Sequence, residues 1–502
     1  MKRNSWHQSR RWLVGAAATW TAFSGAQATP ALQPQLATGT NETFPVSLGR
    51  FAFQREGVLG TSFELLVGAA RADDARVCEQ QVLAEVERLR RIFSIYDPAS
   101  EISRVRAGAP VTSTELEFLF STYGLWSQRT SGAINVNMSE VIRLWREARD
   151  LPPAASALAE AFAQPRAFNV DALGKGYIID SAVAIARRFA PAGLLNIGGD
   201  IRAWGNVDWP VGVANPFAPA ENAPLLGRFV LRDGAVATSG GYSRFVNLAG
   251  RQYSHILDPR TLQPVSQVSS ATMVAADCLT ANALSTAANV LGLDEGVRLA
   301  KLFGAWEYLL VDSKGRTEST TALAAGSAAA PATPESPKPG TETPVVPVAG
   351  PAWPTNYQVN INLNFKAPPD GRARRPYVAV WVENSNKKLV RTISVWGKDF
   401  RYLRELSGWW QAADSYSDAF AQSVTRATRA PGKYVLAWDG LDDKKQPVAQ
   451  GEYKIVMEIN REHGRHLTES VTIKCGAEAQ SAELRATSES DASIIEYGPK
   501  TP

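Results

Sequence analysis

The sequence is poor in the residues that form disulfides and thiolate or imidazole metal sites. Its 502 residues include three cysteines, Cys78, Cys278 and Cys475, which are odd in number and widely spaced. They form neither a disulfide framework nor a CxxC pair, so we expect buried thiols that pack as small apolar side chains. Histidine is almost as rare, and His255 is the only one between positions 8 and 462.

The chain also has little net charge once its first residues are set aside. The formal charge is +4, but residues 1–28 hold four basic residues and no acid, which leaves 49 residues of each sign in the remainder. A neutral chain lacks the basic footprint of a nucleic-acid-binding protein, so we expect no nucleic acid and no anionic membrane surface as partner. No apolar stretch is long enough to span a bilayer, so we do not expect a transmembrane protein.

Residues 1–28 have the features of an export signal. The positive segment "MKRNSWHQSRR" precedes the short apolar segment "WLVGAAATWTAFSG", and "AQA" at 26–28 is a small-x-small cleavage site. The stretch "SRRWLV" at 9–14 resembles a twin-arginine signal, so the Sec and twin-arginine routes both remain open. We therefore expect an exported protein that works in the periplasm.

Changes in composition divide the rest of the chain. Residues 319–352 are rich in Ala, Pro, Thr and Ser and contain no aromatic residue, so they cannot bury a core and predict an extended linker. We expect a large domain over residues 43–318, a smaller domain over 353–476, and a tail over 477–502.

The two expected domains differ in their hydrophobic patterns. In the larger one, Val77 to Ser94 has the spacing of an amphipathic helix, and a further helix is expected from Asp277 to Gly292. Strands in series flanked by a few helices predict an α+β fold. In the smaller domain, "YQVNINLNF" at 357–365 alternates apolar and polar residues, and similar short segments follow. This spacing predicts an immunoglobulin-like β-sandwich.

Two short segments contain candidates for catalysis and anion binding. In "YSHILDP", His255 precedes Asp258 by three residues, which is typical of a general base with an orienting carboxylate and equally of a strand histidine beside a turn. In "DALGKGY", Lys175 is flanked by two glycines before an expected helix at 181–189. The spacing of a Walker A loop is absent, but the backbone N–H groups and the lysine offer an anion site.

Polar residues in the expected helix after Asp277 are candidates for metal binding. Asn282 and Thr286 are four residues apart, with Ser285 beside Thr286, so they share one helix face. Oxygen donors of this kind suit Mg²⁺. An exposed polar face with no ligand is the alternative. The segments "NIGGDIRAWG" and "VATSGGYSRF" place glycines beside Asp200 and Ser239, which indicates either close approach of a ligand or ordinary turns.

Several of these segments, in the order in which they occur, resemble the ApbE-type FAD:protein FMN transferases over approximately residues 50–312. The segments are "GTSFELLV", "SIYDPASEISRV", "SGAINVN", "DALGKGYIID", "NIGGDIRAWG", "VATSGGYSRF", "YSHILDPRT" and "ANALSTA". The resemblance implies a T-fold-like α+β domain, with an uncharacterised β domain appended to it. It also implies a reaction in which a Ser or Thr hydroxyl of a target protein attacks the FMN-side phosphorus of FAD and AMP leaves.

The resemblance assigns a role to each candidate. His255 would take the proton of the attacking hydroxyl, and Asp258 would orient it or support the metal environment. Mg²⁺ and Lys175 would stabilise the charge of the diphosphate. The implied metal ligands are the Ala172 carbonyl and the side chains of Asn282, Ser285 and Thr286. The implied FAD contacts are Leu59, Tyr96, Ala133, Ile134, Asn135, Asn169, Lys175 and Leu257.

Some positions depart from the family pattern. Asn135, Asn169 and Asn282 stand where the family usually has Asp, and Leu59 stands where it usually has Met. An amide can still coordinate Mg²⁺, but it gives up a full charge, so we expect weaker metal affinity.

The sequence does not identify the acceptor of the FMN group. The family's acceptor motif, roughly D-x-x-[ST]-G-A-[ST], has no full match in this chain. We therefore expect the acceptor to be another protein, periplasmic or membrane-associated, which carries the modified Ser or Thr. An FAD diphosphatase that releases FMN and AMP, and a non-catalytic flavin-binding module, are the alternatives.

Overall fold

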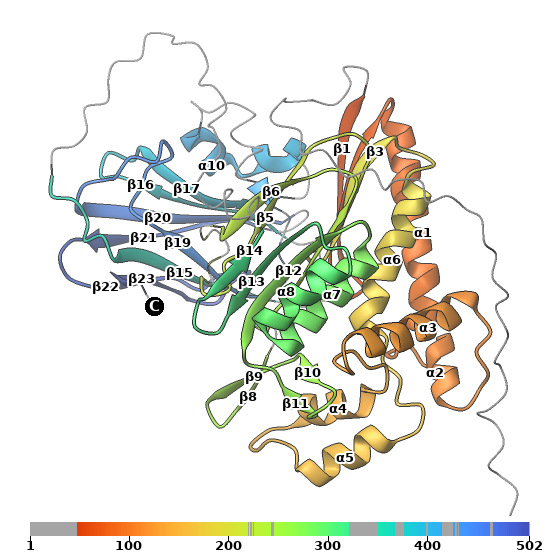
Figure 1. Ribbon diagram of the computed structural model, residues 1–502. Coiled ribbons are helices and arrows are strands. Elements are labelled where there is room, and N and C mark those ends of the chain that lie inside the picture. The colour runs from red at the N-terminus through yellow and green to blue at the C-terminus, as the bar shows by residue number, and fades with distance from the viewer. Residues whose placement is uncertain are drawn as a thin grey trace, which may run out of the picture. The chain divides into compact units, whose positions relative to one another are not determined.

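The computed structural model (Figure 1) contains two regions with separate hydrophobic cores. It describes residues 48–218, 220, 223, 225–241, 245–320, 350–366, 376–397, 400–413, 425–426, 429, 431–461 and 465–500. The expected export signal at 1–28 lies outside these residues, as do residues 321–349 of the expected linker. One core draws on residues between Phe63 and Leu310, and another on residues between Val359 and Tyr497. We refer to residues 48–320 as the N-terminal region and to residues 350–500 as the C-terminal region.

The N-terminal region is built on an eight-stranded antiparallel sheet with strand order β1-β2-β3-β4-β7-β12-β13-β14. Alternate residues of β2 are fully buried, which is the period expected of a strand with one face on a core. The strands are β1 Gly49–Val58, β2 Thr61–Ala69, β3 Ala192–Ile197, β4 Asp200–Trp204, β7 Ala235–Ser239, β12 Val268–Ala275, β13 Glu307–Asp312 and β14 Thr317–Ser319. A separate hairpin is formed by β5 Trp209–Val213 and β6 Gly227–Leu231.

Four helices pack against this sheet and against one another (Figure 1): α1 Ala72–Phe93, α6 Asp171–Ala186, α7 Cys278–Leu291 and α8 Leu293–Leu302. The α+β prediction is therefore confirmed. The expected helix from Asp277 to Gly292 is also confirmed, because the Asp277 side chain caps α7 by accepting from the Thr280 N–H at 2.7 Å.

Helix α6 begins ten residues earlier than the helix expected at 181–189, so "DALGKGY" is helical and not a loop. The reason is tertiary packing. A Cβ at Gly176 would lie 2.8 Å from the carbonyl oxygen of Cys278, so glycine allows α6 to approach the start of α7 closely. The Gly174 N–H donates to the Val170 carbonyl at 2.6 Å, so that backbone group does not offer an anion site.

A smaller cluster of helices and short strands carries the segment with His255. The helices of this cluster are α4 Ser139–Glu147 and α5 Ala155–Ala163, and its strands are β8 Phe245–Leu248, β9 Arg251–Ser254, β10 Leu257–Asp258 and β11 Gln263–Pro264. Helices α2 Glu101–Arg106 and α3 Thr114–Arg129 pack on the main core instead. Leu248 and Leu257 share a hydrophobic cluster with Val141 and Trp145 of α4, and the Trp145 indole donates to the Leu262 carbonyl at 2.9 Å. The His255 segment is thus held by α4 and α5.

The C-terminal region consists mainly of β-strands in two sheets. Their orders are β19-β15-β23-β22 and β18-β17-β16-β20-β21. The elements are β15 Tyr357–Phe365, β16 Tyr377–Glu383, β17 Leu389–Trp396, η1 Phe400–Glu405, α10 Ser407–Ala412, β18 Thr425–Arg426, β19 Gly432–Trp438, β20 Gly451–Asn460, β21 His466–Cys475, β22 Gln480–Leu484 and β23 Ser493–Pro499. Both sheets contribute to one core. The β-rich prediction is confirmed, while the immunoglobulin-like connectivity stays a prediction.

The expected tail at 477–502 is a wrong prediction, because residues 480–499 contain two paired strands. Strand β23 lies between β15 and β22, and Ile495 and Tyr497 are almost fully buried. Their alternation with polar residues is the signature of a strand with one face on a core.

Two further predictions concern the cysteines and the membrane. All three cysteines are unpaired and buried, as expected. In the part of the chain that the structure describes, no helix combines the length and apolar character needed to cross a membrane.

Candidate active site

A buried carboxylate joins two of the expected site residues. Gly198 and Gly199, with φ of 60° and 92°, form the two-residue turn between β3 and β4, and Asp200 follows as the first residue of β4. Asp200 is 1% exposed. Its Oδ2 lies 2.8 Å from Nζ of Lys175 on α6 and accepts from Nδ2 of Asn282 on α7 at 2.7 Å. Two helices and one strand therefore meet at a single carboxylate oxygen.

Burial and hydrogen bonding have opposite effects on the pKa of Asp200. Burial raises the pKa of Asp200 above its ordinary value, although Lys175, the Thr238 backbone and the Asn282 amide oppose the shift. The Lys175 side chain is 31% exposed, so its ammonium connects the buried carboxylate with the surface. An ammonium has three N–H donors, and only one is needed for the contact with Asp200.

Three hydroxyls gather beside this contact. The Ser239 hydroxyl at the end of β7 lies 3.0 Å from the Ser285 hydroxyl and 3.3 Å from the Thr286 hydroxyl, both on α7. Ser285 is fully buried and donates to the Asn282 carbonyl at 3.1 Å. The alternative of an exposed polar helix face is therefore wrong, because these side chains face β7 and not the solvent.

The donor set fits a weakly held Mg²⁺ ion. Hydroxyl and amide oxygens are hard ligands of the kind that Mg²⁺ accepts, usually together with water and substrate phosphate. Ala172 lies half-buried in the first turn of α6, one turn before Lys175, and the expected role of its carbonyl as a ligand stays a prediction. Among the described residues there is no group of three His, Cys, Asp or Glu side chains that could form a metal site.

His255 follows β9 directly and is exposed. The neighbouring Asp258 is 8% exposed, and its carboxylate accepts from Arg260 three times: from the backbone N–H at 2.9 Å, from Nε at 2.8 Å and from Nη2 at 2.7 Å. Burial raises the pKa of Asp258, but the hydrogen bonds from Arg260 outweigh it and the net shift is downward. Asp258 thus stabilises the turn after β10, and its expected action on His255 stays a prediction.

Two asparagines of the expected FAD site form adjoining turns at the start of α6. The Asn135 side chain accepts from the Asn137 N–H at 2.8 Å, and the Asn169 side chain accepts from the Asp171 N–H at 2.7 Å. The Asn169 N–H donates to the Val136 carbonyl at 2.7 Å, so the two turns lie side by side. The structure therefore brings the segments 133–137 and 169–172 together.

The other expected FAD residues differ in how they could reach a ligand. Tyr96 is 67% exposed, and the Arg146 guanidinium lies 5.9 Å from its ring centre. Ala133, Ile134 and Leu257 have buried side chains, so any contact would involve their backbone atoms. Leu59 has a positive φ of 51° in the turn between β1 and β2.

Two side chains of this site, Asp200 and Ser239, are not predicted as site residues by the sequence, which shows them only as polar residues at strand ends. The two glycines before Asp200 are the available signal. A third polar side chain near α7 has a structural role. Asp180 on α6 accepts from the N–H groups of Cys278 and Leu279 at 2.9 Å each and so caps the start of α7. Burial raises the pKa of Asp180 to about 6.

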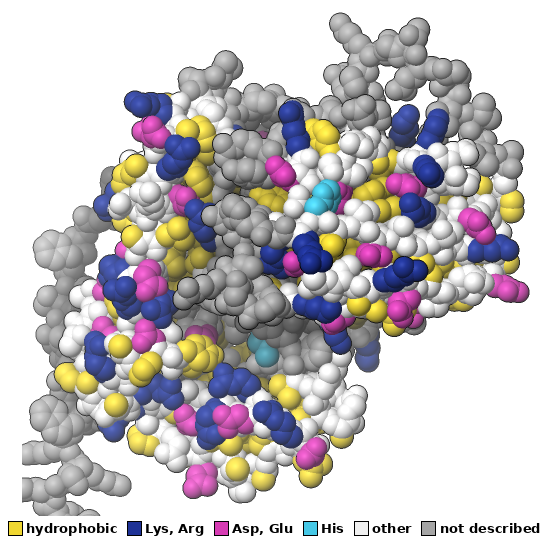
Figure 2. Space-filling model, turned by 180° about the vertical axis from the view of Figure 1, so that it is seen from behind, with side chains coloured by type: hydrophobic (Ala, Val, Ile, Leu, Met, Phe, Trp, Pro, Cys, Tyr) yellow, Lys and Arg dark blue, Asp and Glu magenta, His cyan; other side chains and the backbone are white. Residues whose placement is uncertain are grey.

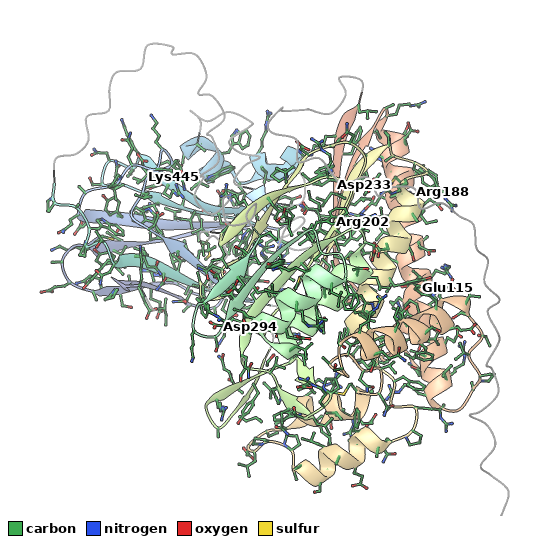
Figure 3. All side chains as sticks on the ribbon, viewed as in Figure 1. Glu115, Arg188, Arg202, Asp233, Asp294 and Lys445 are labelled. Carbon is green, nitrogen blue, oxygen red and sulfur yellow. The ribbon has the colours of Figure 1, made fainter. Side chains whose placement is uncertain are left out.

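Arg202 connects Asp180 to the surface. Its side chain lies 3.4 Å from Asp180 and 3.8 Å from Asp233, and Figure 3 shows Arg202 close to Asp233.

On the face in Figure 2, basic and acidic side chains of the described residues are interspersed, and neither sign forms a large patch there.

Comparison with known proteins shows two matching families. Residues 59–310, half of the chain, match the ApbE family, and residues 358–492 match a family described as a predicted periplasmic protein (DUF2271). The chain is 27% identical over 241 residues to an FAD:protein FMN transferase of Klebsiella pneumoniae (strain 342), which covers 43% of this chain and 75% of that protein. It is 24% identical over 314 residues to that of Treponema pallidum (strain Nichols), which covers 53% and 86%. Among solved structures, the ApbE protein of Thermotoga maritima is 26% identical and covers 54% of this chain and 97% of that chain, with a TM-score of 0.49.

Proposed function

The chain belongs to the ApbE family through residues 59–310, and from this premise we propose that it transfers the FMN part of FAD to a Ser or Thr hydroxyl of another protein and releases AMP. Relatives named FAD:protein FMN transferase support the activity. The observation that carries the proposal is the meeting of Lys175, Asp200 and Asn282 beside three hydroxyls, because it combines a cation with hard oxygen donors. Such a site suits the diphosphate of FAD.

The metal site in this proposal consists of the Ala172 carbonyl, Asn282, Ser285 and Thr286. A bound Mg²⁺ ion would neutralise part of the diphosphate charge. The Nδ2 of Asn282 donates to Asp200, so the amide oxygen of Asn282 is the atom that can contact a cation. The same geometry gives Lys175 a fixed position, from which its remaining N–H groups can donate to phosphate oxygens.

His255 acts as the general base in this proposal. A bond forms between the acceptor oxygen and the FMN-side phosphorus, the bond from that phosphorus to the AMP oxygen breaks, and the hydroxyl proton passes to His255. The exposure of His255 supports this role, because a protein acceptor must reach the base from outside. Asp258 keeps the turn after His255 in place through Arg260, and so fixes where the imidazole stands.

We assign FAD binding to the adjoining turns at Asn135 and Asn169, to Lys175, and to Tyr96. The exposed Tyr96 ring offers an aromatic face for stacking. Leu59 contributes from the turn between β1 and β2. Ala133, Ile134 and Leu257 contribute through their backbones, since their side chains are buried.

We further propose that the protein is exported and acts in the periplasm on a separate acceptor protein. The export signal read at residues 1–28 and the match of residues 358–492 to a predicted periplasmic family support this location. The chain contains no complete acceptor motif of its own family, which supports an acceptor on another chain.

The test is incubation of the protein with FAD, Mg²⁺ and a fusion protein that carries the family's acceptor motif. AMP release together with fluorescent flavin bound covalently to the fusion protein supports the proposal. AMP release with free FMN alone indicates an FAD diphosphatase. FAD binding without AMP release indicates a binding module and contradicts the proposed transfer.

A further inference from the structure

The groups assigned to the metal carry no formal charge. They are one backbone carbonyl, one amide and two hydroxyls, whereas divalent cations in oxygen sites are held more tightly as the number of carboxylates rises. A carboxylate does touch this set, because Asp200 accepts a hydrogen bond from Asn282 at 2.7 Å. The same carboxylate oxygen pairs with Lys175 at 2.8 Å.

We propose that Asp200 is a positioning residue of this site, which turns the Asn282 amide oxygen toward the cation and holds the Lys175 ammonium beside the diphosphate. The inference rests on the proposed function and deepens it. The nitrogen and oxygen of an amide diverge from one carbon, so an amide with its nitrogen on Asp200 directs its oxygen away from Asp200. Without that acceptor, the amide is able to rotate and present N–H groups to the cation, which repels them.

The burial of Asp200 supports a role beyond folding. A carboxylate that is 1% exposed is unfavourable unless it is paired and hydrogen-bonded. Its side-chain partners here are Lys175 and Asn282, two residues already assigned to the substrate and the metal. Asp200 also starts β4 directly after the Gly198–Gly199 turn, which fixes its position relative to both helices.

An amide at position 282 avoids a like-charge contact with Asp200. A carboxylate there would place a second negative charge against Asp200 at the 2.7 Å contact that Asn282 Nδ2 now makes. Like charges at such a distance disfavour each other in the absence of a cation. A carboxylate at 282 would, however, present an oxygen to the cation in either orientation and would not need Asp200 to orient it.

This difference gives a test by a double-mutant cycle of wild type, Asp200→Asn, Asn282→Asp and the double variant. The readouts are Mn²⁺ affinity from the electron paramagnetic resonance signal of the free ion, FAD affinity from flavin fluorescence, and the metal-free unfolding temperature. Asp200→Asn is expected to weaken Mn²⁺ binding roughly 10–100-fold, as loss of a residue that orients a metal ligand does. It is also expected to weaken FAD binding, because Lys175 loses its anchor.

In the Asn282→Asp background, Asp200→Asn is expected to change Mn²⁺ affinity by no more than about twofold. Asn282→Asp alone is expected to lower the metal-free unfolding temperature, and the double variant to recover it. Effects of Asp200→Asn that are equal in both backgrounds overturn the inference, and so does a wild-type protein that binds no Mn²⁺. If Asp200→Asn does not fold, Asp200→Glu replaces it, since it keeps the charge but displaces the oxygens.

Asp180→Asn is the matched control. It removes a carboxylate that also contacts α7, but at the backbone of Cys278 and Leu279. It is expected to leave Mn²⁺ affinity unchanged whatever its effect on the unfolding temperature. A loss as large as that of Asp200→Asn would mean that any loosening of α7 disrupts the site, and would contradict a specific role of Asp200. AMP release by the wild type is measured separately. If the wild type releases AMP but the effects of the two substitutions on Mn²⁺ affinity are additive, only the role of Asp200 is rejected and the proposed function stands.

Discussion

The close approach of α6 and α7 can be tested by two glycine substitutions on one helix. A Cβ at Gly176 would lie 2.8 Å from two backbone atoms, the Cys278 carbonyl oxygen and the Leu279 Cα, which cannot move aside independently. A Cβ at Gly174 would meet only side-chain atoms, the nearest at 3.6 Å, which is ordinary contact. Both residues lie inside α6, so the two variants share the same change in helix propensity.

Two opposing effects determine the change in unfolding free energy of these variants. Replacing glycine by alanine within a helix stabilises it by about 1 kcal/mol. Forcing an extra carbon into a packed interface costs about 1–3 kcal/mol. We therefore expect Gly174→Ala to be neutral or more stable than wild type, and Gly176→Ala to be less stable than Gly174→Ala by about 1–3 kcal/mol. Gly176→Ala should also weaken Mn²⁺ and FAD binding, because it moves Lys175 relative to Asn282.

The assay is chemical denaturation of the wild type and both variants, with and without FAD. The transition that FAD shifts is the one to compare, because a ligand stabilises only the part of the chain that binds it. Equal stability of Gly176→Ala and Gly174→Ala would refute the packing of α6 on α7, and with it the geometry of the proposed site.

Further predictions concern the base, the α7 cap and the C-terminal sheet. His255→Ala should abolish AMP release while FAD fluorescence titration shows unchanged binding; residual turnover near the wild-type rate would exclude His255 as the base. The raised pKa of Asp180, about 6, means that the folded state binds a proton more readily than the unfolded state. Its contribution to stability should therefore fall as the pH rises from about 4 to about 6, and the unfolding temperature of Asp180→Asn relative to wild type should rise across that range. Ile495→Ala, at a fully buried position of β23, should cost about 2–5 kcal/mol in denaturation, whereas Ile494→Ala, with 49% exposure, should cost about 0.5 kcal/mol or less; equal effects would mean that β23 is not part of the sheet.

Local patterns in the sequence predict those parts of the fold that depend on neighbouring residues. The helix from Asp277 to Gly292 has its capping side chain and its terminal glycine within the sequence itself, so the sequence predicts both ends. The alternation in residues 357–365 likewise predicts strand β15, because a strand with one face on a core needs only that period.

The parts that depend on distant residues could not be predicted in this way. Glycines at 174 and 176 are typical of a loop, and only the later approach of Cys278 explains why one of them lies within a helix. Strand β23 is short and separated from its partner β15 by more than a hundred residues, so the sequence alone predicts a tail there.

The same distinction between neighbouring and distant residues applies to the candidate site. The helix spacing of Asn282, Ser285 and Thr286 places them together, but it does not show that they are buried against Ser239. Contact between Asp200, Lys175 and Asn282 requires the packing of three elements, which no spacing rule contains. The pairing of Asp258 with Arg260 competes with a direct role toward His255, and only the geometry of the turn reveals it.

The central claim is that this chain transfers FMN from FAD to a protein hydroxyl. The most direct measurement is mass spectrometry of the acceptor fusion protein after incubation with FAD and Mg²⁺, with AMP quantified in the same sample. We predict one FMN phosphoester on the motif's Ser or Thr for each AMP released, and no modification when that residue is replaced by Ala or when His255→Ala is used. AMP formed in equal amounts with and without the acceptor hydroxyl, while the acceptor mass stays unchanged, would contradict the claim.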